Sequence, residues 1–115
     1  MLTVTRITPR QVLARTKRGE RVAFVDARDP AQRAASAWRI SGAVEAGLDT
    51  LLADASRVER SGPVVVYGQD GAEPDLPRVA KRLQALGFRE VRLLAGGIDA
   101  WAGERLAVEP SGARA

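Results

Sequence analysis

The chain has 115 residues, of which 45% are hydrophobic and 28% are charged, the balance of a globular protein that buries a core without disulfides or metal ions. It contains neither cysteine nor histidine, which excludes disulfides, thiolate nucleophiles, serine–histidine triads and sulfur or imidazole metal ligands. The formal net charge of +4 comes from arginines spread along the chain. Because aromatic residues are scarce, we interpret these arginines as a solvated surface and do not expect nucleic acid as a partner.

No apolar run approaches the roughly 20 residues that cross a bilayer. The N-terminal residues also lack the apolar centre of a signal peptide. We therefore expect a cytoplasmic protein with no membrane partner. The length predicts one domain over residues 1–115, and residues 110–115 are expected to form a flexible tail.

The first elements carry clear start signals. Thr8 precedes Pro9 and lies three residues before Gln11, the spacing of a capping box, so a short helix is expected to end near Gly19. Residues 21–27 contain a continuous apolar run that includes Val22, Phe24 and Val25, which predicts a strand buried on both faces.

The middle of the chain continues this alternation. Asp29 and Pro30 repeat the cap-plus-proline signal and predict a helix through residues 31–35. Residues 38–44 indicate a turn that leads into a short strand. A further helix is expected to begin in residues 47–52, with its apolar face formed by Leu48, Leu51, Leu52 and Ala55.

The second half predicts two more strands and two more helices. Residues 64–67 form a strand; Asp75 can cap the following helix, and Gly87 ends it. The apolar stripe of that helix consists of Leu76, Val79, Ala80, Leu83 and Leu86. Residues 91–94 form the next strand, followed by a Gly96-Gly97 turn and a short helix. This alternation predicts an α/β fold with a central, mainly parallel sheet covered by helices on both faces.

In α/β proteins, ligands bind where a strand ends and a helix begins. Here that place is the loop after residues 64–67, which contains Gly68, Gln69, Asp70, Gly71, Ala72 and Glu73. No side chain in this loop is a good nucleophile. The loop also lacks the Gly-Lys-Ser/Thr sequence that completes a phosphate-binding loop.

The order and spacing of short motifs along nearly the whole chain resemble the rhodanese family. The matching residues are Val25-Asp26-Ala27-Arg28, Ile40, Gly42-Ala43, Val64-Val65-Val66-Tyr67, Leu83, Gly87-Phe88, Val91, Leu94, Gly96-Gly97 and Ala100-Trp101. The resemblance implies a rhodanese-like α/β fold.

The resemblance also implies a cysteine at the position of Gly68. In the family its thiolate, held by backbone N–H groups, takes sulfur from a donor such as thiosulfate and passes it on. Glycine offers no sulfur atom, so this route is not open to the chain. Where family members that bind anions often carry an arginine, this loop has Asp70, Glu73 and Asp75, and Pro74 removes one backbone donor.

Four residues outside the loop complete the candidate site. We interpret Asp26 and Arg28 as a structural ion pair that ties loops together. Trp38 and Arg39 are candidate contacts for a partner, because a loop tryptophan near the rim can anchor one. Burial of Trp38 under the neighbouring helix is the alternative. Both residues begin the stretch Trp38-Arg39-Ile40-Ser41-Gly42-Ala43, where many family members have Gly-His-Ile-Pro-Gly-Ala.

These observations predict a catalytically inactive rhodanese-like domain that acts as a binding or regulatory module. We expect an unidentified protein partner, no cofactor, no metal and no catalytic residue. Three alternatives stay open: a metal or cationic-ligand site on the acidic loop 68–75, an anion or nucleic-acid site made by the arginines, and a sulfurtransferase whose cysteine was lost or engineered away.

Overall fold

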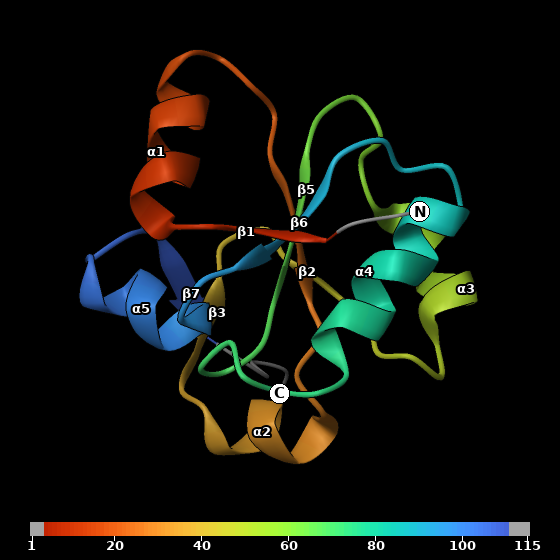
Figure 1. The fold of residues 1–115 in the computed structure, drawn as a ribbon. Coiled ribbons are helices and arrows are strands. Elements are labelled where there is room, and N and C mark those ends of the chain that lie inside the picture. The colour runs from red at the N-terminus through yellow and green to blue at the C-terminus, as the bar shows by residue number, and fades with distance from the viewer. Residues whose placement is uncertain (1–3, 111–115) are drawn as a thin grey trace.

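The computed structural model describes residues 4–110 and shows an alternation of strands and helices (Figure 1). The elements are β1 (Thr5–Ile7), α1 (Pro9–Lys17), β2 (Ala23–Asp26), α2 (Pro30–Ala35), β3 (Trp38–Ile40), β4 (Val44–Glu45), α3 (Leu51–Asp54), the 3₁₀ turn η1 (Ala55–Arg57), β5 (Val64–Tyr67), α4 (Leu76–Ala85), β6 (Val91–Leu94), α5 (Gly97–Gly103) and β7 (Val108–Pro110).

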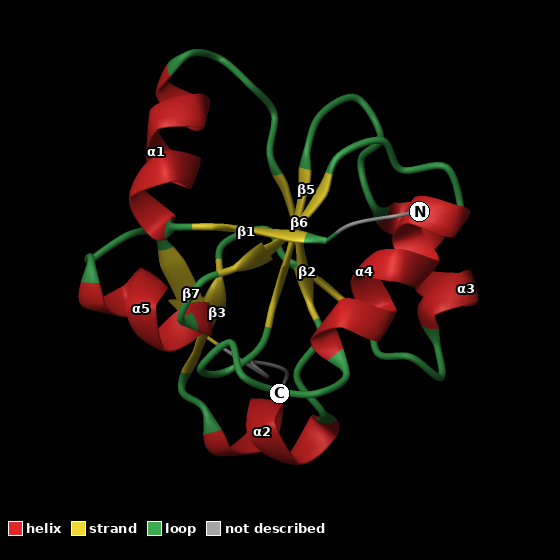
Figure 2. Ribbon diagram, viewed as in Figure 1, coloured by secondary structure: helices red, strands yellow, loops and turns green. Residues whose placement is uncertain are grey.

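Five of the strands form a parallel sheet in the order β1-β6-β5-β2-β4. The strands β3 and β7 form a separate antiparallel pair (Figure 2). The central parallel sheet was predicted from the sequence. Residues 38–40 form β3, so the prediction that the segment begins as a turn was wrong. The strands β1 and β7 were not predicted.

The side chains of β5 divide between two hydrophobic clusters, one on each face of the sheet. Val64 and Val66 pack in the cluster that includes residues of α3 and α4. Val65 and Tyr67 pack in the cluster that includes residues of α1 and α5. This division follows from the alternation of side chains along a strand. The prediction that helices cover both faces is confirmed.

Two helices begin with a capping box; the one at Thr8 was predicted, whereas at Asp29 the sequence predicted only a cap followed by proline. The Thr8 hydroxyl accepts a hydrogen bond from the Gln11 backbone N–H, and the Gln11 side chain accepts one from the Thr8 N–H. Asp29 and Gln32 repeat this arrangement at α2. Such a cap stabilises a helix by about 1 kcal/mol. This matters most for α2, which has no buried residue.

Three details differ from the sequence-based expectations. Asp75 occupies the N-cap position of α4, but its side chain makes no capping hydrogen bond. Leu52, expected on an inner face, is 78% exposed because α3 is only one turn long and buries Leu51 instead. Pro110 ends β7, and the rest of the predicted tail lies outside the described residues.

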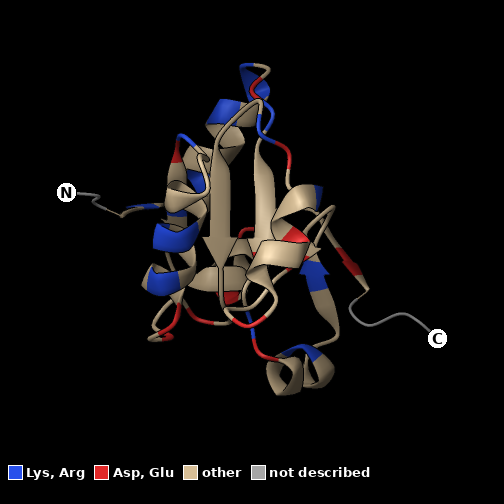
Figure 3. Cartoon of the chain, turned by 90° about the vertical axis from the view of Figure 1, so that its right-hand side faces the viewer, with Lys and Arg blue, Asp and Glu red and all other residues tan. Residues whose placement is uncertain are grey.

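The parallel strands end at one edge of the sheet, and the loops that follow β2 and β5 lie side by side there, since Asp26 is in register with Tyr67. Figure 3 shows acidic segments in the loops at the lower end of the view, toward which the strand arrows point. Within residues 4–110, no helix is long and apolar enough to cross a membrane.

Candidate functional site

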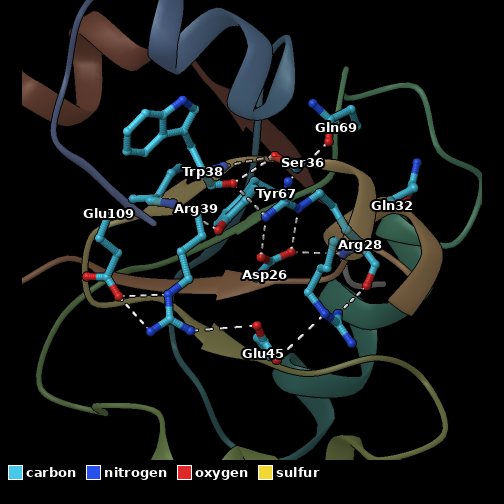
Figure 4. Close-up of polar contacts among 12 residues, drawn as sticks. Asp26, Arg28, Gln32, Ser36, Trp38, Arg39, Glu45, Tyr67, Gln69 and Glu109 are labelled. Atoms are coloured by element: carbon cyan, nitrogen blue, oxygen red, sulfur yellow. Dashed lines mark hydrogen bonds and ion pairs between the residues drawn. The ribbon is translucent and has the colours of Figure 1, made fainter. Parts of the chain in front are cut away.

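A buried ion pair stands at the carboxyl end of β2 (Figure 4). The Arg28 guanidinium donates to both carboxylate oxygens of Asp26, with Nη2–Oδ2 at 2.8 Å and Nε–Oδ1 at 3.0 Å, and both side chains are fully buried. The remaining donors of Arg28 reach the Gln69 side chain at 3.1 Å and the Trp38 carbonyl at 3.1 Å. One guanidinium therefore links the ends of three chain segments.

The electrostatics of this pair fix its charge. Burial is the largest single influence and lowers the pKa of Arg28, but the hydrogen bonds to Asp26, the Asp26 charge and Tyr67 together outweigh burial and hold this pKa above its usual value. Burial, followed by the nearby Asp26 charge, raises the pKa of Tyr67, whose hydroxyl accepts a hydrogen bond from the Ile40 N–H at 3.1 Å. Arg28 and Tyr67 therefore keep one protonation state near neutral pH.

The loop after β5 is held from the outside by the start of α5. The carbonyls of Gly68 and Gln69 accept hydrogen bonds from the backbone N–H groups of Ile98 and Asp99, both at 3.0 Å. This close approach requires Gly97, because its φ is +60° and a Cβ there would lie 2.6 Å from the Gly68 carbonyl oxygen. Because α5 binds the carbonyls of Gly68 and Gln69, the N–H groups of Gln69 and Gly71 need an acceptor other than α5.

That acceptor is the side chain of Glu73. Its Oε1 accepts a hydrogen bond from the Gly71 N–H at 3.0 Å, and its Oε2 accepts one from the Gln69 N–H. The Gln32 side-chain amide donates to Oε2 at 3.2 Å. We call these three donors, Gln69 N–H, Gly71 N–H and the Gln32 amide, the cradle. No lysine or arginine of residues 4–110 forms an ion pair with Glu73, so neutral groups alone hold its carboxylate.

The Glu73 carboxylate also fills the space beside Gly68. A Cβ added at Gly68 would lie 2.6 Å from Cδ and 2.7 Å from Oε2 of Glu73, far inside van der Waals contact. A side chain at position 68 and the present position of Glu73 therefore exclude one another. Gly68 is buried at the end of β5, where the resemblance places the nucleophile.

The other acidic residues of the rim make separate contacts. Asp70 accepts a hydrogen bond from the Ala72 N–H at 2.9 Å, and Asp99 accepts one from the Gln69 side chain at 2.8 Å. Asp75 is exposed and lies 3.9 Å from Arg78. Among the described residues, no group of three or more acidic side chains is placed to hold a metal ion. The metal-site alternative thus gains no support from the geometry of the loop.

The two candidate partner contacts differ in their surroundings. Trp38 is 49% exposed, and Figure 4 shows its indole directed away from the buried ion pair. The Arg39 guanidinium lies 2.6 Å from Glu109 and 3.6 Å from Glu45, so it ties β3 to β7 and β4. The Gly42 N–H and then Arg39 lower the pKa of Glu109. Of the two, Trp38 presents the more available side chain.

Sequence reasoning missed the residues that complete the cradle. Gln32 was not singled out at all, and Glu73 was recognised only as a negative charge in the loop. The usable signal is a glutamate that follows two glycines in a loop after a buried strand, with no basic residue from Gly68 to Leu76 to pair with it. Within that stretch, such a carboxylate has only backbone N–H groups and neutral side chains as partners.

The parallel sheet with helices on both faces, and the amide-lined loop after its central strand, define an α/β protein built around an anion cradle. A family model, that of the rhodanese-like domain, matches residues 8–104. The chain therefore belongs to the rhodanese-like domain family. A search of curated proteins gives no match.

Solved structures agree with this assignment. A full-length protein from Lactobacillus plantarum is 25% identical with a TM-score of 0.72, over 90% of this chain and 86% of that one. The Alr3790 protein from Anabaena is 26% identical with a TM-score of 0.68, over 90% and 81%. A thiosulfate sulfurtransferase from Pseudomonas aeruginosa is 26% identical with a TM-score of 0.71, over 91% of this chain but only 20% of that larger protein.

Proposed function

We propose that this chain is a rhodanese-like domain without sulfurtransferase activity that binds a protein partner and acts as a regulatory module. The observation that carries the proposal is the pairing of Gly68 with Glu73 at the place of the family's nucleophile. Sulfur transfer by the family route needs a thiolate that carries the sulfur covalently, and the chain contains no cysteine.

The same pairing argues against a sulfurtransferase that has merely had its cysteine exchanged. A cysteine has a Cβ, and at position 68 this atom would collide with the carboxylate of Glu73. Regaining the family's arrangement would require Glu73 to move as well. Gly68 and Glu73 fit each other, which supports a loop adapted to the absence of a nucleophile.

The surface best suited to a partner lies around Trp38. Its indole is exposed, while its carbonyl accepts hydrogen bonds from the buried Arg28 and from the Ser36 hydroxyl at 2.9 Å, so its backbone is held firmly. An aromatic side chain on a rigid backbone loses little entropy on binding and is a common anchor of protein interfaces. The Arg28 guanidinium connects this surface to the loop with Gly68, because it donates hydrogen bonds both to the Trp38 carbonyl and to the Gln69 side chain.

Enzymatic activity is tested with the purified chain, thiosulfate and cyanide. We expect thiocyanate formation at the uncatalysed rate, with a cysteine-containing sulfurtransferase assayed in parallel as the positive control. Turnover above that background would overturn the proposal.

Partner binding is tested by capture from extracts of the native cell with the unchanged tagged chain and three variants. Trp38→Ala should lose proteins that the unchanged chain retains. Leu52→Ala is the matched control, because it removes the other large exposed hydrophobic side chain of the described residues. A third variant, Asp70→Asn with Asp75→Asn, tests the acidic rim. Identical captured sets for Trp38→Ala and Leu52→Ala would contradict the proposed surface.

A further inference from the structure

We infer that Glu73 is a tethered ligand of the cradle and the residue that decides its specificity, because its carboxylate occupies the site and keeps external oxyanions out. The carboxylate accepts hydrogen bonds from three neutral donors on two segments, Gln69 and Gly71 of the loop and Gln32 of α2. The inference deepens the proposed function and rests on its claim that the loop performs no chemistry.

Glu73 does not act as an ordinary helix cap. It lies two residues before Asp75, the N-cap of α4, yet its carboxylate reaches backward to the N–H groups of Gln69 and Gly71. A capping side chain would instead accept from N–H groups in the first turn of the helix that follows. The contacts of Glu73 therefore close the loop on itself and satisfy donors that would otherwise face a ligand.

Tethering gives this carboxylate an advantage over a free anion. It is held in place by a chain segment of a few residues, so it competes as an intramolecular group with a high effective concentration. A free sulfate or thiosulfate would have to displace it, and would then lie close to the displaced charge and to Asp70. Because like charges at short distance repel, the Glu73 carboxylate keeps oxyanions out of the cradle.

This assignment has a consequence for the kind of ligand that the rim can accept. The anionic sulfur donors of the family are excluded by charge and by occupancy, independently of the missing thiol. A partner that binds next to the loop meets exposed groups such as Asp70, and not the backbone N–H groups of the cradle.

The test measures sulfate and thiosulfate binding by calorimetry in the unchanged chain and three variants. Glu73→Ala empties the cradle and should bind either anion at least about tenfold more tightly than the unchanged chain, a difference of about 1.4 kcal/mol. Glu73→Gln removes the charge but keeps the bulk, so its gain should be smaller. Asp70→Asn is the matched control, since it removes one negative charge from the same loop outside the cradle; its affinity should stay within about twofold of the unchanged chain.

Backbone NMR locates the bound anion. In Glu73→Ala, sulfate should shift the amide signals of Gln69 and Gly71 more than those of other loop residues. A folded Glu73→Ala chain whose sulfate affinity equals that of Asp70→Asn would overturn the inference, as would sulfate-induced shifts that spare Gln69 and Gly71.

A second measurement needs no variant and covers the case in which Glu73→Ala does not fold. In a pH titration of the unchanged chain, the amide protons of Gln69 and Gly71 should shift with the same midpoint as the Glu73 side-chain carboxyl carbon. Different midpoints would overturn the inference. Sulfurtransferase turnover by the unchanged chain would instead refute the proposed function and leave these binding results unaffected, so the two failures are distinguishable.

Discussion

The ends of β2 and β5 lie next to each other in the sheet, and each has a hydrogen-bonded carboxylate nearby: Asp26 is the last residue of β2, and Glu73 lies in the loop after β5. At β2, Asp26 is fully buried and its charge is balanced by Arg28 at 2.8 Å. At β5, Glu73 is only partly buried, and its partners are neutral N–H groups. The first carboxylate therefore depends on one cation, whereas the second depends on the shape of a loop.

The two carboxylates therefore have different roles: Asp26 stabilises the edge of the sheet, whereas Glu73 occupies the candidate site. The Asp26–Arg28 pair links the chain after β2 to the loop with Gln69 and to β3, so its loss would loosen the whole edge. Glu73 occupies the space that a nucleophilic side chain at position 68 would need. Because Glu73 has no cationic partner, replacing it leaves no unpaired charge in the core. The fold can therefore be kept while the loop acquires another role.

The largest expected effect on the free energy of unfolding comes from removing Arg28. Arg28→Met leaves Asp26 buried without a cation, and we expect a loss of about 3 to 5 kcal/mol in the free energy of unfolding, measured with urea at neutral pH. Lys81→Met, an exposed change on α4, is the control and should stay within about 0.5 kcal/mol. A loss below about 1 kcal/mol for Arg28→Met would show that the pair does not hold this edge together.

A smaller loss in the free energy of unfolding is expected when a side chain is added at Gly68. Gly68→Ala places a Cβ against the Glu73 carboxylate, the end of a flexible side chain, which must swing away and lose its hydrogen bonds in the cradle, at a cost of about 0.5 to 1.5 kcal/mol. In a Glu73→Ala background, the same substitution should cost about 1 kcal/mol less, because the colliding group is absent. The double-mutant cycle is measured by urea unfolding. Strict additivity would mean that the two residues do not compete for this space.

A cysteine placed at position 68 sharpens the comparison. In Gly68→Cys the thiol lies against the Glu73 carboxylate, which disfavours the thiolate and raises the pKa of the thiol. In Gly68→Cys with Glu73→Ala, the backbone N–H groups of Gln69 and Gly71 face the sulfur and lower that pKa. The pH at which alkylation by iodoacetamide reaches half its maximal rate should therefore be lower in the double variant by at least about one unit. Equal midpoints would contradict the assignment of the cradle.

The smallest effect concerns an ion pair away from both strand ends. Hydrogen bonds from Arg15 at 2.5 and 2.9 Å lower the pKa of Glu90 below its ordinary value of 4.5. Glu90→Gln should cost about 0.5 to 1 kcal/mol at neutral pH.

The sign of the pH dependence follows from the lowered pKa of Glu90. Its stabilisation is complete above pH 4.5 and disappears as the pH falls through the lower pKa of the folded state. The urea unfolding curves of the Glu90→Gln variant and the unchanged chain should therefore converge in acid. A constant difference between them down to strongly acidic pH would contradict the role of this charge.

Much of the fold was predictable because its signals are local. The capping boxes at Thr8 and Asp29, the valine run of β5 and the apolar stripe of α4 each lie within one short segment. The strands β1 and β7 have three residues each and no periodicity to detect. They exist because β6 and β3, distant in the sequence, offer them backbone partners.

The sequence predicts where the candidate site lies, but not which side chains meet there. That Gly68 offers no nucleophilic side chain follows from the residue type alone. That Glu73 turns inward does not, since its direction depends on the α5 contacts that orient the loop carbonyls and on Gln32 from α2. Side-chain direction in a loop is set by tertiary contacts, and no periodic pattern encodes it.

The central claim is that this scaffold has no atom able to carry sulfur. The most direct test incubates the unchanged chain with thiosulfate, follows thiocyanate formation with cyanide, and weighs the intact protein by mass spectrometry during the reaction. We predict thiocyanate at the uncatalysed rate and a protein mass unchanged by even one sulfur atom. A covalent adduct one sulfur atom heavier, together with turnover above background, would contradict this account.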